Sequence, residues 1–386
     1  MATPLRILVV DDSSLMRRML RELLGSEPDI VVVGEAANGR EAIERVIELR
    51  PDLITLDVRM PVMDGIETTR QIMAYHPTPI LVLTASLNSY EVDITFQMLG
   101  AGALDVMEKP RLGDQRAIDE ARRLLLRKVR LLSRVKVVTH LRGRRQASPS
   151  EPGFAPRPLA ALSPAPRREP IPPRAKAVVP PHVPVVSVSS APFPIVVIGA
   201  STGGPKIVLQ ILAGLPRTFP AAILIVQHIA QGFSGGMAEW LGASIKLPVH
   251  LATEGALLTP GEVLVAPDRF DLLVQPHGSI HLSNHPLLLQ RPAIDIAMQS
   301  VAAVFGSAAT GVLLTGMGRD GAIGMQAIRR TGGLTIAQDE ATSTIFGMPR
   351  AAIELGAAML VLPPAQIVST LVERVTSRPS DAGAVR

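Results

Sequence analysis

The sequence predicts an α/β protein in which a proline-rich linker joins two doubly wound parallel-sheet domains. In both halves, short apolar runs alternate with segments of helical periodicity, which is typical of β–α repeats around a parallel sheet. Residues 149–194 contain 14 of the 34 prolines and no periodic apolar pattern, which indicates an extended linker. A length of 386 residues also fits two domains.

The predicted elements follow the chain in order. In the first unit, the expected strands lie at 7–10, 30–33, 53–56, 80–83 and 103–106, with helices between them such as 14–24 and 39–49. In the second unit, they lie at 195–198, 222–226, 263–265, 311–314 and 334–337. We therefore expect a first domain over 1–125, a basic and then proline-rich linker over 126–193, a second domain over 194–375 and a tail over 376–386.

Composition narrows the class of protein. The chain is 47% hydrophobic and only 3% aromatic, which allows sizeable cores and argues against stacking platforms for single-stranded nucleic acid. It has no cysteine, which excludes a disulfide framework, a thiol nucleophile and a Cys-ligated metal. With no signal-peptide pattern and no unbroken apolar span, we expect a cytoplasmic protein without membrane insertion.

The net charge of +5 is unevenly distributed. Between Arg122 and Lys176 there are fifteen basic residues and two acidic ones, so the remainder of the chain is acidic. A basic run can indicate nucleic-acid binding. The favoured interpretation is a solvated helix face followed by a soluble linker.

Complementary polar residues follow four predicted strands of the first unit. They are Asp11 and Asp12, Asp57, Thr84 and Lys109. Because the carboxyl ends of parallel strands meet at one edge, three carboxylates, a hydroxyl and an ammonium group should lie together there. Oxygen ligands suit Mg²⁺, and a carboxylate can attack phosphorus to form an aspartyl phosphate. Each residue alone could be a helix cap, but the set predicts a phosphoryl-accepting pocket.

This pattern, with the stretch 57–65 (DVRMPVMDG), resembles the receiver domains of two-component response regulators, which have a flavodoxin-like fold. The resemblance implies Asp57 as phosphoacceptor, Asp11, Asp12 and Asp57 as Mg²⁺ ligands, and Thr84 and Lys109 as the phosphate switch. Val106 stands where receivers usually have an aromatic residue, which does not favour a switch by ring rotation.

The second unit begins with a strand, a glycine turn and a helical pattern, which places Ser201 at a strand-to-helix corner. The stretch 199–203 (GASTG) fits both a phosphate-binding glycine turn and the Gly-x-Ser-x-Gly spacing of an exposed nucleophile. The next strand ends at His228, and the strand 311–314 leads into a glycine-rich loop with Asp320. A serine nucleophile needs a base and a group that orients the base, so these residues favour catalysis. Asp320 could instead cap the helix that starts at residue 322.

Further stretches make the resemblance specific to one family, the chemotaxis response-regulator protein-glutamate methylesterases (CheB type), with a Rossmann-like serine esterase domain. They are 199–205 (GASTGGP), 226–229 (VQHI), 258–261 (LTPG), 265–267 (VAP), 291–292 with Asp295, 314–321 (LTGMGRDG), 337–340 (AQDE) and 346–349 (FGMP). The resemblance implies a catalytic triad of Ser201, His228 and Asp320, with Met317 and Thr202 at the oxyanion or support positions. Asp268 and Asp271 lie where the family has a different pattern, and no role is carried over to them.

The resemblance implies hydrolysis of glutamate γ-methyl esters on chemoreceptor helices, often with deamidation of glutamines. It also implies Mg²⁺ in the receiver, no cofactor for the esterase, chemoreceptors as substrate and a chemotaxis-type histidine kinase as phosphodonor. No nucleic acid is expected. The rival interpretation is a response regulator whose output domain binds a nucleotide or nucleic acid through 199–204 and 122–145. A third keeps the enzyme but assigns it a receptor array that does not serve motility.

Overall fold

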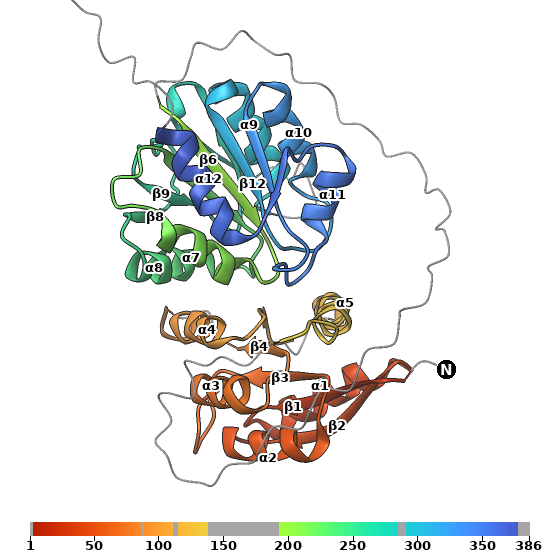
Figure 1. The fold of residues 1–386 in the computed structure, drawn as a ribbon. Helices are drawn as coiled ribbons and strands as arrows, with labels where there is room; N and C mark the ends of the chain where they lie inside the picture. The colour runs from red at the N-terminus through yellow and green to blue at the C-terminus, as the bar shows by residue number, and fades with distance from the viewer. Residues whose placement is uncertain (1–2, 86–88, 111–114, 138–192, 285–290, 377–386) are drawn as a thin grey trace, which may run out of the picture.

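Two parallel β-sheets, each with helices on both faces, make up the computed structural model, which describes residues 3–85, 89–110, 115–137, 193–284 and 291–376 (Figure 1). The predicted α/β class with two parallel sheets is confirmed. Most of the predicted proline-rich linker lies outside the described residues. Among the described residues, no helix is both long and apolar enough to cross a bilayer.

The first sheet has the strand order β2-β1-β3-β4-β5, and all its pairs are parallel. Its strands are β1 (Leu5–Val10), β2 (Ile30–Ala36), β3 (Leu53–Asp57), β4 (Ile80–Thr84) and β5 (Asp105–Glu108). Its helices are α1 (Ser14–Gly25), α2 (Gly39–Leu49), α3 (Gly65–Tyr75), α4 (Ser89–Ala101) and α5 (Gln115–Leu132). The expected strand at 103–106 begins two residues late, because the N–H groups of residues 102 and 103 instead bond to Met98 and close the turn after α4.

Helix starts in this unit follow from short polar side chains. Asn38 precedes α2, and its Oδ1 accepts a hydrogen bond from the Glu41 backbone N–H at 3.1 Å. In return, Glu41 Oε2 accepts from the Ala37 backbone N–H at 2.8 Å. Such reciprocal caps satisfy N–H groups that have no partner inside the helix, which fixes where the helix begins.

The second sheet has the strand order β14-β13-β12-β6-β7-β9-β8 and is also parallel throughout. Its strands are β6 (Ile195–Ala200), β7 (Ala222–Gln227), β8 (Val249–Leu251), β9 (Val263–Val265), β12 (Ala309–Leu313), β13 (Leu334–Gln338) and β14 (Leu360–Leu362). Its helices are α7 (Gly204–Gly214), α8 (Ser234–Ser244), α9 (Ile294–Phe305), α10 (Ala322–Arg330), α11 (Met348–Glu354) and α12 (Pro364–Thr376). The edge strands β8 and β14 and the hairpin of β10 (Asp271–Val274) and β11 (Ile280–Ser283) were not predicted. Most residues of β8 and β14 are exposed, whereas the equally short β9, which was predicted, is a fully buried apolar run.

The order of the second sheet reverses beside its first strand. The chain leaves β6 toward β7 on one side, whereas β12 pairs with β6 on the other. In open α/β sheets, such a reversal opens a crevice beyond the carboxyl ends of the strands, where ligands bind. The loops that carry Ser201, His228 and Asp320 all follow strands at this reversal.

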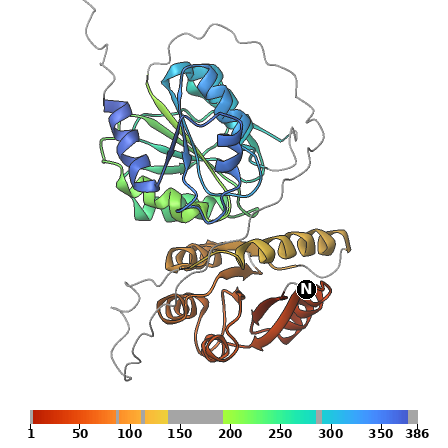
Figure 2. The same ribbon diagram turned by 45° about the vertical axis from the view of Figure 1, so that its right-hand side comes forward.

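The first unit covers one edge of the second, as two views of the ribbon agree (Figures 1 and 2). Helix α4 packs against α8, where the rings of Phe96 and Trp240 stack with centroids 5.3 Å apart and planes at 22°. A Cβ added to Gly236 would lie 2.0 Å from Val92 Cγ1, so only glycine allows this close approach. The hydrophobic core is therefore continuous from the first unit into the second.

Candidate functional site

The acidic pocket of the first unit forms as predicted. Asp57 ends β3, and Asp11 and Asp12 follow β1. Ligand oxygens of these three carboxylates lie within 4.8 Å of one another. Lys109 Nζ lies 2.7 Å from Asp11 Oδ2 and 2.9 Å from Asp57 Oδ1. Three carboxylates and one ammonium group thus share one small, largely buried site.

Burial controls the charge of this pocket. It raises the pKa of Asp57 to about 6, although the Lys109 ammonium opposes the shift. Burial would lower the pKa of Lys109, but the carboxylates of Asp57 and Asp11 hold it above its ordinary value. Without a further cation, the pocket therefore holds more negative charge than Lys109 can offset.

The donor set fits Mg²⁺. Its ligands are carboxylate oxygens only, which is the chemistry that hard divalent cations prefer. Receiver domains generally use this metal for phosphorylation. A divalent cation would also offset the charge that burial makes unfavourable at Asp57.

The predicted switch residue Thr84 ends β4 and contacts the next helix. Its Oγ1 donates a hydrogen bond to Glu91 Oε2 in α4 at 3.1 Å. Arg59 Nε, two residues after Asp57, lies 3.2 Å from Glu91 Oε1. The end of β4 and the loop after β3 are thus both tied to α4, the helix that packs on the second unit.

The second site pairs two of the three residues that the sequence singled out, His228 and Asp320, and places Ser201 at the end of the strand next to that of His228. Ser201 follows β6 and His228 follows β7, and both are buried at 8% exposure. His228 Nε2 lies 2.8 Å from Asp320 Oδ2. His228 Nδ1 is buried and has no hydrogen-bond partner in the described part of the chain. The nitrogen that remains available to a serine hydroxyl is therefore Nδ1.

Asp320 is fixed by backbone donors as well as by histidine. Its carboxylate accepts hydrogen bonds from the N–H groups of Ile294 at 2.8 Å, Asp295 at 2.9 Å and Gly321 at 2.9 Å. The alternative in which Asp320 caps α10 is wrong, because the first two of these donors begin α9. Burial alone would raise the pKa of Asp320, but the bonds from His228 and this helix start hold it below its ordinary value.

Asp295 adds a second carboxyl group beside the first. Its Oδ1 accepts from the Gly324 backbone N–H at 2.7 Å. Burial, and then the charge of Asp320, raise the pKa of Asp295 to about 7. The two neighbouring carboxyl groups therefore titrate apart, and Asp320 is the one that stays ionised beside His228.

Two further predicted residues lie where the units meet. Thr202 Oγ1 donates to Asp105 Oδ2 of β5 at 2.9 Å. Met317 Sδ accepts a weak hydrogen bond from Arg127 Nε of α5 at 3.0 Å. Lys128 forms a short ion pair with the same Asp105 oxygen. The first unit thus contacts the residue next to Ser201 and the loop before Asp320.

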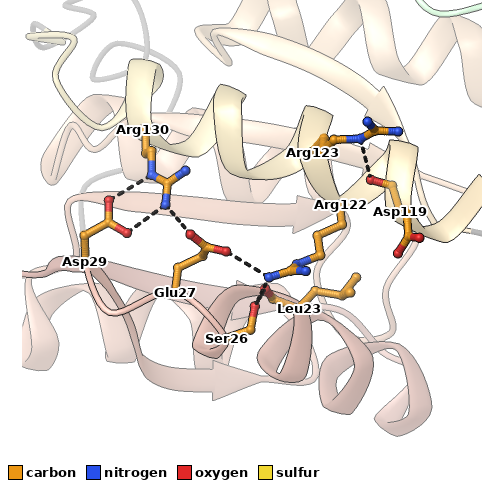
Figure 3. A network of polar contacts seen from close by, with 8 residues as sticks. All are labelled: Leu23, Ser26, Glu27, Asp29, Asp119, Arg122, Arg123 and Arg130. Atoms are coloured by element: carbon orange, nitrogen blue, oxygen red, sulfur yellow. Dashed lines mark hydrogen bonds and ion pairs between the residues drawn. The ribbon is translucent and has the colours of Figure 1, made fainter.

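The basic residues of α5 are largely engaged by the first unit itself (Figure 3). Arg130 pairs with Asp29 and Glu27, and Arg122 bridges Glu27 and Ser26. The same arginines, with Arg127 and Met317, line a cleft of about 780 Å³. The start of the basic run is therefore a paired helix face that continues past residue 125, not a free nucleic-acid surface.

The departure from the family pattern at Asp268 has a structural explanation. Its Oδ2 accepts from the Gly232 and Ser234 backbone N–H groups and from Ser234 Oγ, at 2.8, 3.1 and 2.9 Å. These bonds anchor the start of α8, the helix that follows the loop carrying His228. Asp271 is fully buried, and its Oδ1 accepts from the Ala293 N–H at 3.0 Å.

Sequence reasoning missed two residues at the second site. Asp295 stands out in the sequence only as part of a family motif, because nothing local shows that it lies beside Asp320. Asp105 carries no motif at all, and its contact with Thr202 joins residues 97 positions apart. Only the packing of one unit on the other could reveal it.

Comparisons with known proteins show which families the two units resemble. Residues 7–121 match the family model of the response regulator receiver domain, and 196–371 match that of CheB methylesterase. A protein-glutamate methylesterase/protein-glutamine glutaminase of Syntrophus aciditrophicus is 42% identical over 96% of this chain and 98% of its own. One of Anaeromyxobacter dehalogenans is 43% identical over 96% and 97%. The crystal structure of the Thermotoga maritima CheB methylesterase catalytic domain is 39% identical, with TM-score 0.46 over 47% of this chain and 99% of that one.

Proposed function

The chain belongs to the CheB methylesterases that carry a receiver domain, and from that premise we propose how its residues perform and regulate ester hydrolysis. The protein is a response-regulator methylesterase of the chemotaxis type. The substrates we assign to it are glutamate methyl esters, and also glutamines, on the cytoplasmic helices of methyl-accepting chemoreceptors. The nucleotide-binding alternative is not supported.

Ser201 is the nucleophile in this proposal. Its Oγ attacks the ester carbonyl while His228 Nδ1 takes the hydroxyl proton. The same nitrogen then returns this proton to the departing methoxy oxygen, which leaves as methanol. Water attacks the acyl-enzyme in the second half, with His228 again as base, and releases free glutamate. Met317 and Thr202 support the oxyanion that forms in each half. No cofactor takes part.

One observation carries this assignment: His228 uses Nε2 for Asp320 and leaves a buried Nδ1 without a partner. An ionised Asp320 fixes the proton on Nε2, so Nδ1 is the basic nitrogen. Its carboxylate also stabilises the imidazolium that forms when Nδ1 takes the serine proton.

The receiver pocket is assigned to phosphorylation of Asp57. The phosphodonor is a histidine kinase of the chemotaxis type, and Asp11, Asp12 and Asp57 would hold Mg²⁺. The metal, when bound, supplies charge stabilisation for the transferring phosphoryl group. Lys109 Nζ, already 2.9 Å from Asp57 Oδ1, pairs with a phosphoryl oxygen after transfer.

Control by phosphorylation follows from the contacts between the units. In the arrangement described, Asp105 binds Thr202 beside Ser201, and α5 contacts Met317. A phosphoryl group on Asp57 offers Thr84 a new acceptor, which competes with Glu91 of α4. Because α4 carries Phe96 onto Trp240, release of this bond weakens the closed arrangement. No aromatic residue at position 106 is needed.

The same elements and contacts set the proposed domain boundaries. We assign the receiver to 1–132 instead of the predicted 1–125, because α5 runs to Leu132 and packs in the core of the first unit. The linker is then assigned to 133–193, the esterase to 194–375 and the tail to 376–386, in a protein that acts in the cytoplasm.

The test measures methanol released from methylated receptor fragments by the full-length protein. We expect a basal rate that a small phosphodonor with Mg²⁺ increases. Asp57→Asn should keep the basal rate and lose the stimulation. A variant that is still stimulated would refute the role of Asp57, whereas a wild-type protein that releases no methanol would refute the esterase.

A further inference from the structure

A buried glutamine lies between the two residues that carry the proposed proton transfer. Gln227 is the last residue of β7 and is 2% exposed. Its Nε2 donates hydrogen bonds to the backbone carbonyl oxygen of Ser201 and to that of His228, both at 2.8 Å. One side-chain amide therefore joins the loop after β6 to the loop after β7.

The bond to Ser201 completes the restraint of its backbone. The Ser201 N–H donates to the Thr315 carbonyl at 3.0 Å, and the Ser201 carbonyl also accepts from the Gly204 N–H at 2.8 Å. Both peptide planes beside the Ser201 Cα are thus held. Since these planes set φ and ψ, they fix the direction in which the Cβ and Oγ project.

His228 is restrained in the same way. Its N–H donates to the Ala200 carbonyl at 2.9 Å, and its own carbonyl accepts from Gln227 Nε2. The side chain of Gln227 thus hydrogen-bonds to the backbones of both Ser201 and His228. It therefore couples the position of the serine to that of the histidine ring.

Only a side chain with two N–H donors at this length satisfies both carbonyl groups. A glutamate would place a charge against two carbonyl oxygens, and a methionine of similar length would leave both without this donor. Gln227 Oε1 is buried with no hydrogen-bond partner in the described part of the chain. A Cβ at Gly204 would lie 2.4 Å from that oxygen. An unpaired buried oxygen is unfavourable, so Oε1 gives no reason for a glutamine at this position. The two hydrogen bonds donated by Nε2 do.

We propose that Gln227 is a positioning residue, which sets the Ser201–His228 geometry through two backbone carbonyl groups. It touches neither the substrate nor the reacting atoms, and the proposal rests on the function assigned above. Misplacement of reacting groups by about 1 Å can lower a rate by on the order of 10². Loss of the two Gln227 hydrogen bonds should therefore lower kcat by about 10- to 100-fold and leave KM within about twofold, because substrate contacts remain.

The experiment compares Gln227→Met with Thr335→Val in the full-length protein. Thr335 is an equally buried polar residue on β13, whose hydroxyl donates to the Ala357 carbonyl at 2.7 Å and binds no triad residue. Both variants lose buried hydrogen bonds, so both should lower the melting temperature. Only Gln227→Met should lower kcat and slow the labelling of Ser201 by a small organophosphonate, which reports the serine–histidine geometry without a receptor.

Gln227→Asn provides a second variant should methionine prevent folding, since it keeps a buried amide that is one methylene too short. The proposal fails if a folded Gln227 variant keeps more than half the wild-type kcat and labelling rate, or if Thr335→Val loses as much. These failures leave the esterase assignment intact. Activity retained by Ser201→Ala would instead overturn the assigned mechanism itself.

Discussion

The receiver pocket and the esterase pocket both place a carboxylate at the carboxyl edge of a parallel sheet, but they give it different numbers of hydrogen-bond donors. Asp320 accepts three backbone N–H groups and His228, and its pKa lies below the ordinary value. Asp57 has one backbone donor, Val58, and Lys109, and its pKa rises to about 6. Asp57 is buried, whereas the side chain of Asp320 is 15% exposed. Desolvation raises the pKa of both groups, so the difference lies in the hydrogen-bond donors that oppose it.

This difference matches two kinds of chemistry. A carboxylate that orients a histidine has to stay ionised and fixed, so full hydrogen bonding suits it. A carboxylate that attacks phosphorus needs free lone pairs, and a metal can supply the charge compensation that the protein leaves out. The same edge of the same fold class thus carries two sites, one proposed for ester hydrolysis by side chains and one proposed for phosphorylation with Mg²⁺.

The largest expected effect comes from removing the proposed esterase nucleophile, which leaves the receiver pocket intact. Ser201→Ala should fold as the wild type does and lose on the order of 10⁴–10⁶ in turnover, because no other group can form the acyl-enzyme. Methanol release measures the loss, and the melting temperature checks the fold. Phosphorylation of Asp57 should be unaffected. A variant with a tenth of the wild-type rate would rule out Ser201.

The next test changes the charge of the orienting carboxylate. Asp320→Asn keeps the size of the side chain but can no longer hold the Nε2 proton, so we expect kcat to fall by roughly 10³–10⁴. Combining it with Ser201→Ala should cost little more than Ser201→Ala alone, since the residues act as a unit. Independent, multiplicative losses would contradict the shared mechanism.

The third test uses the raised pKa of Asp57. Its folded value of about 6 exceeds the unfolded 3.8, so the folded protein binds this proton more tightly. Stability from this group is fully present below about pH 4 and is lost as the pH rises through about 6, by about 3 kcal/mol in all.

Thermal unfolding in EDTA between pH 4 and pH 7 measures this dependence. Subtracting the profile of Asp57→Asn should isolate it, because the amide does not titrate. Mg²⁺ should reduce it, since the metal favours the ionised form. Identical profiles for the two proteins would show that the pocket does not raise this pKa.

The smallest expected effect concerns the interface that joins the two pockets. Phe96→Ala removes the stack on Trp240, which contributes about 0.5–1.5 kcal/mol beyond its buried area. If the receiver restrains the esterase, basal methanol release should rise by about 2- to 10-fold. Tyr75→Ala, which removes a half-exposed receiver aromatic on α3, is the matched control. Equal rates for both variants would argue against restraint through this contact.

The sequence predicted the residues of both pockets because strand ends in a parallel sheet share an edge. That rule places Asp57, Ser201, His228 and Asp320 without any knowledge of side-chain geometry. It does not tell which nitrogen of His228 meets Asp320, since that depends on ring orientation. The edge strands β8 and β14 were missed because most of their residues are exposed, whereas β9, also three residues long, is a fully buried apolar run.

The contact between Asp105 and Thr202 has a consequence for the receptor as well as for the enzyme. On the proposed function, a receptor helix that reaches Ser201 would have to displace Asp105, so substrate and receiver would compete for one surface. Binding equilibria of this kind are reciprocal. If phosphorylation raises affinity for the receptor by some factor, then a bound receptor favours the phosphorylated receiver by the same factor. If the proposed receptor substrate is correct, the density of methylated receptors would therefore influence what fraction of the enzyme is in the phosphorylated, active state.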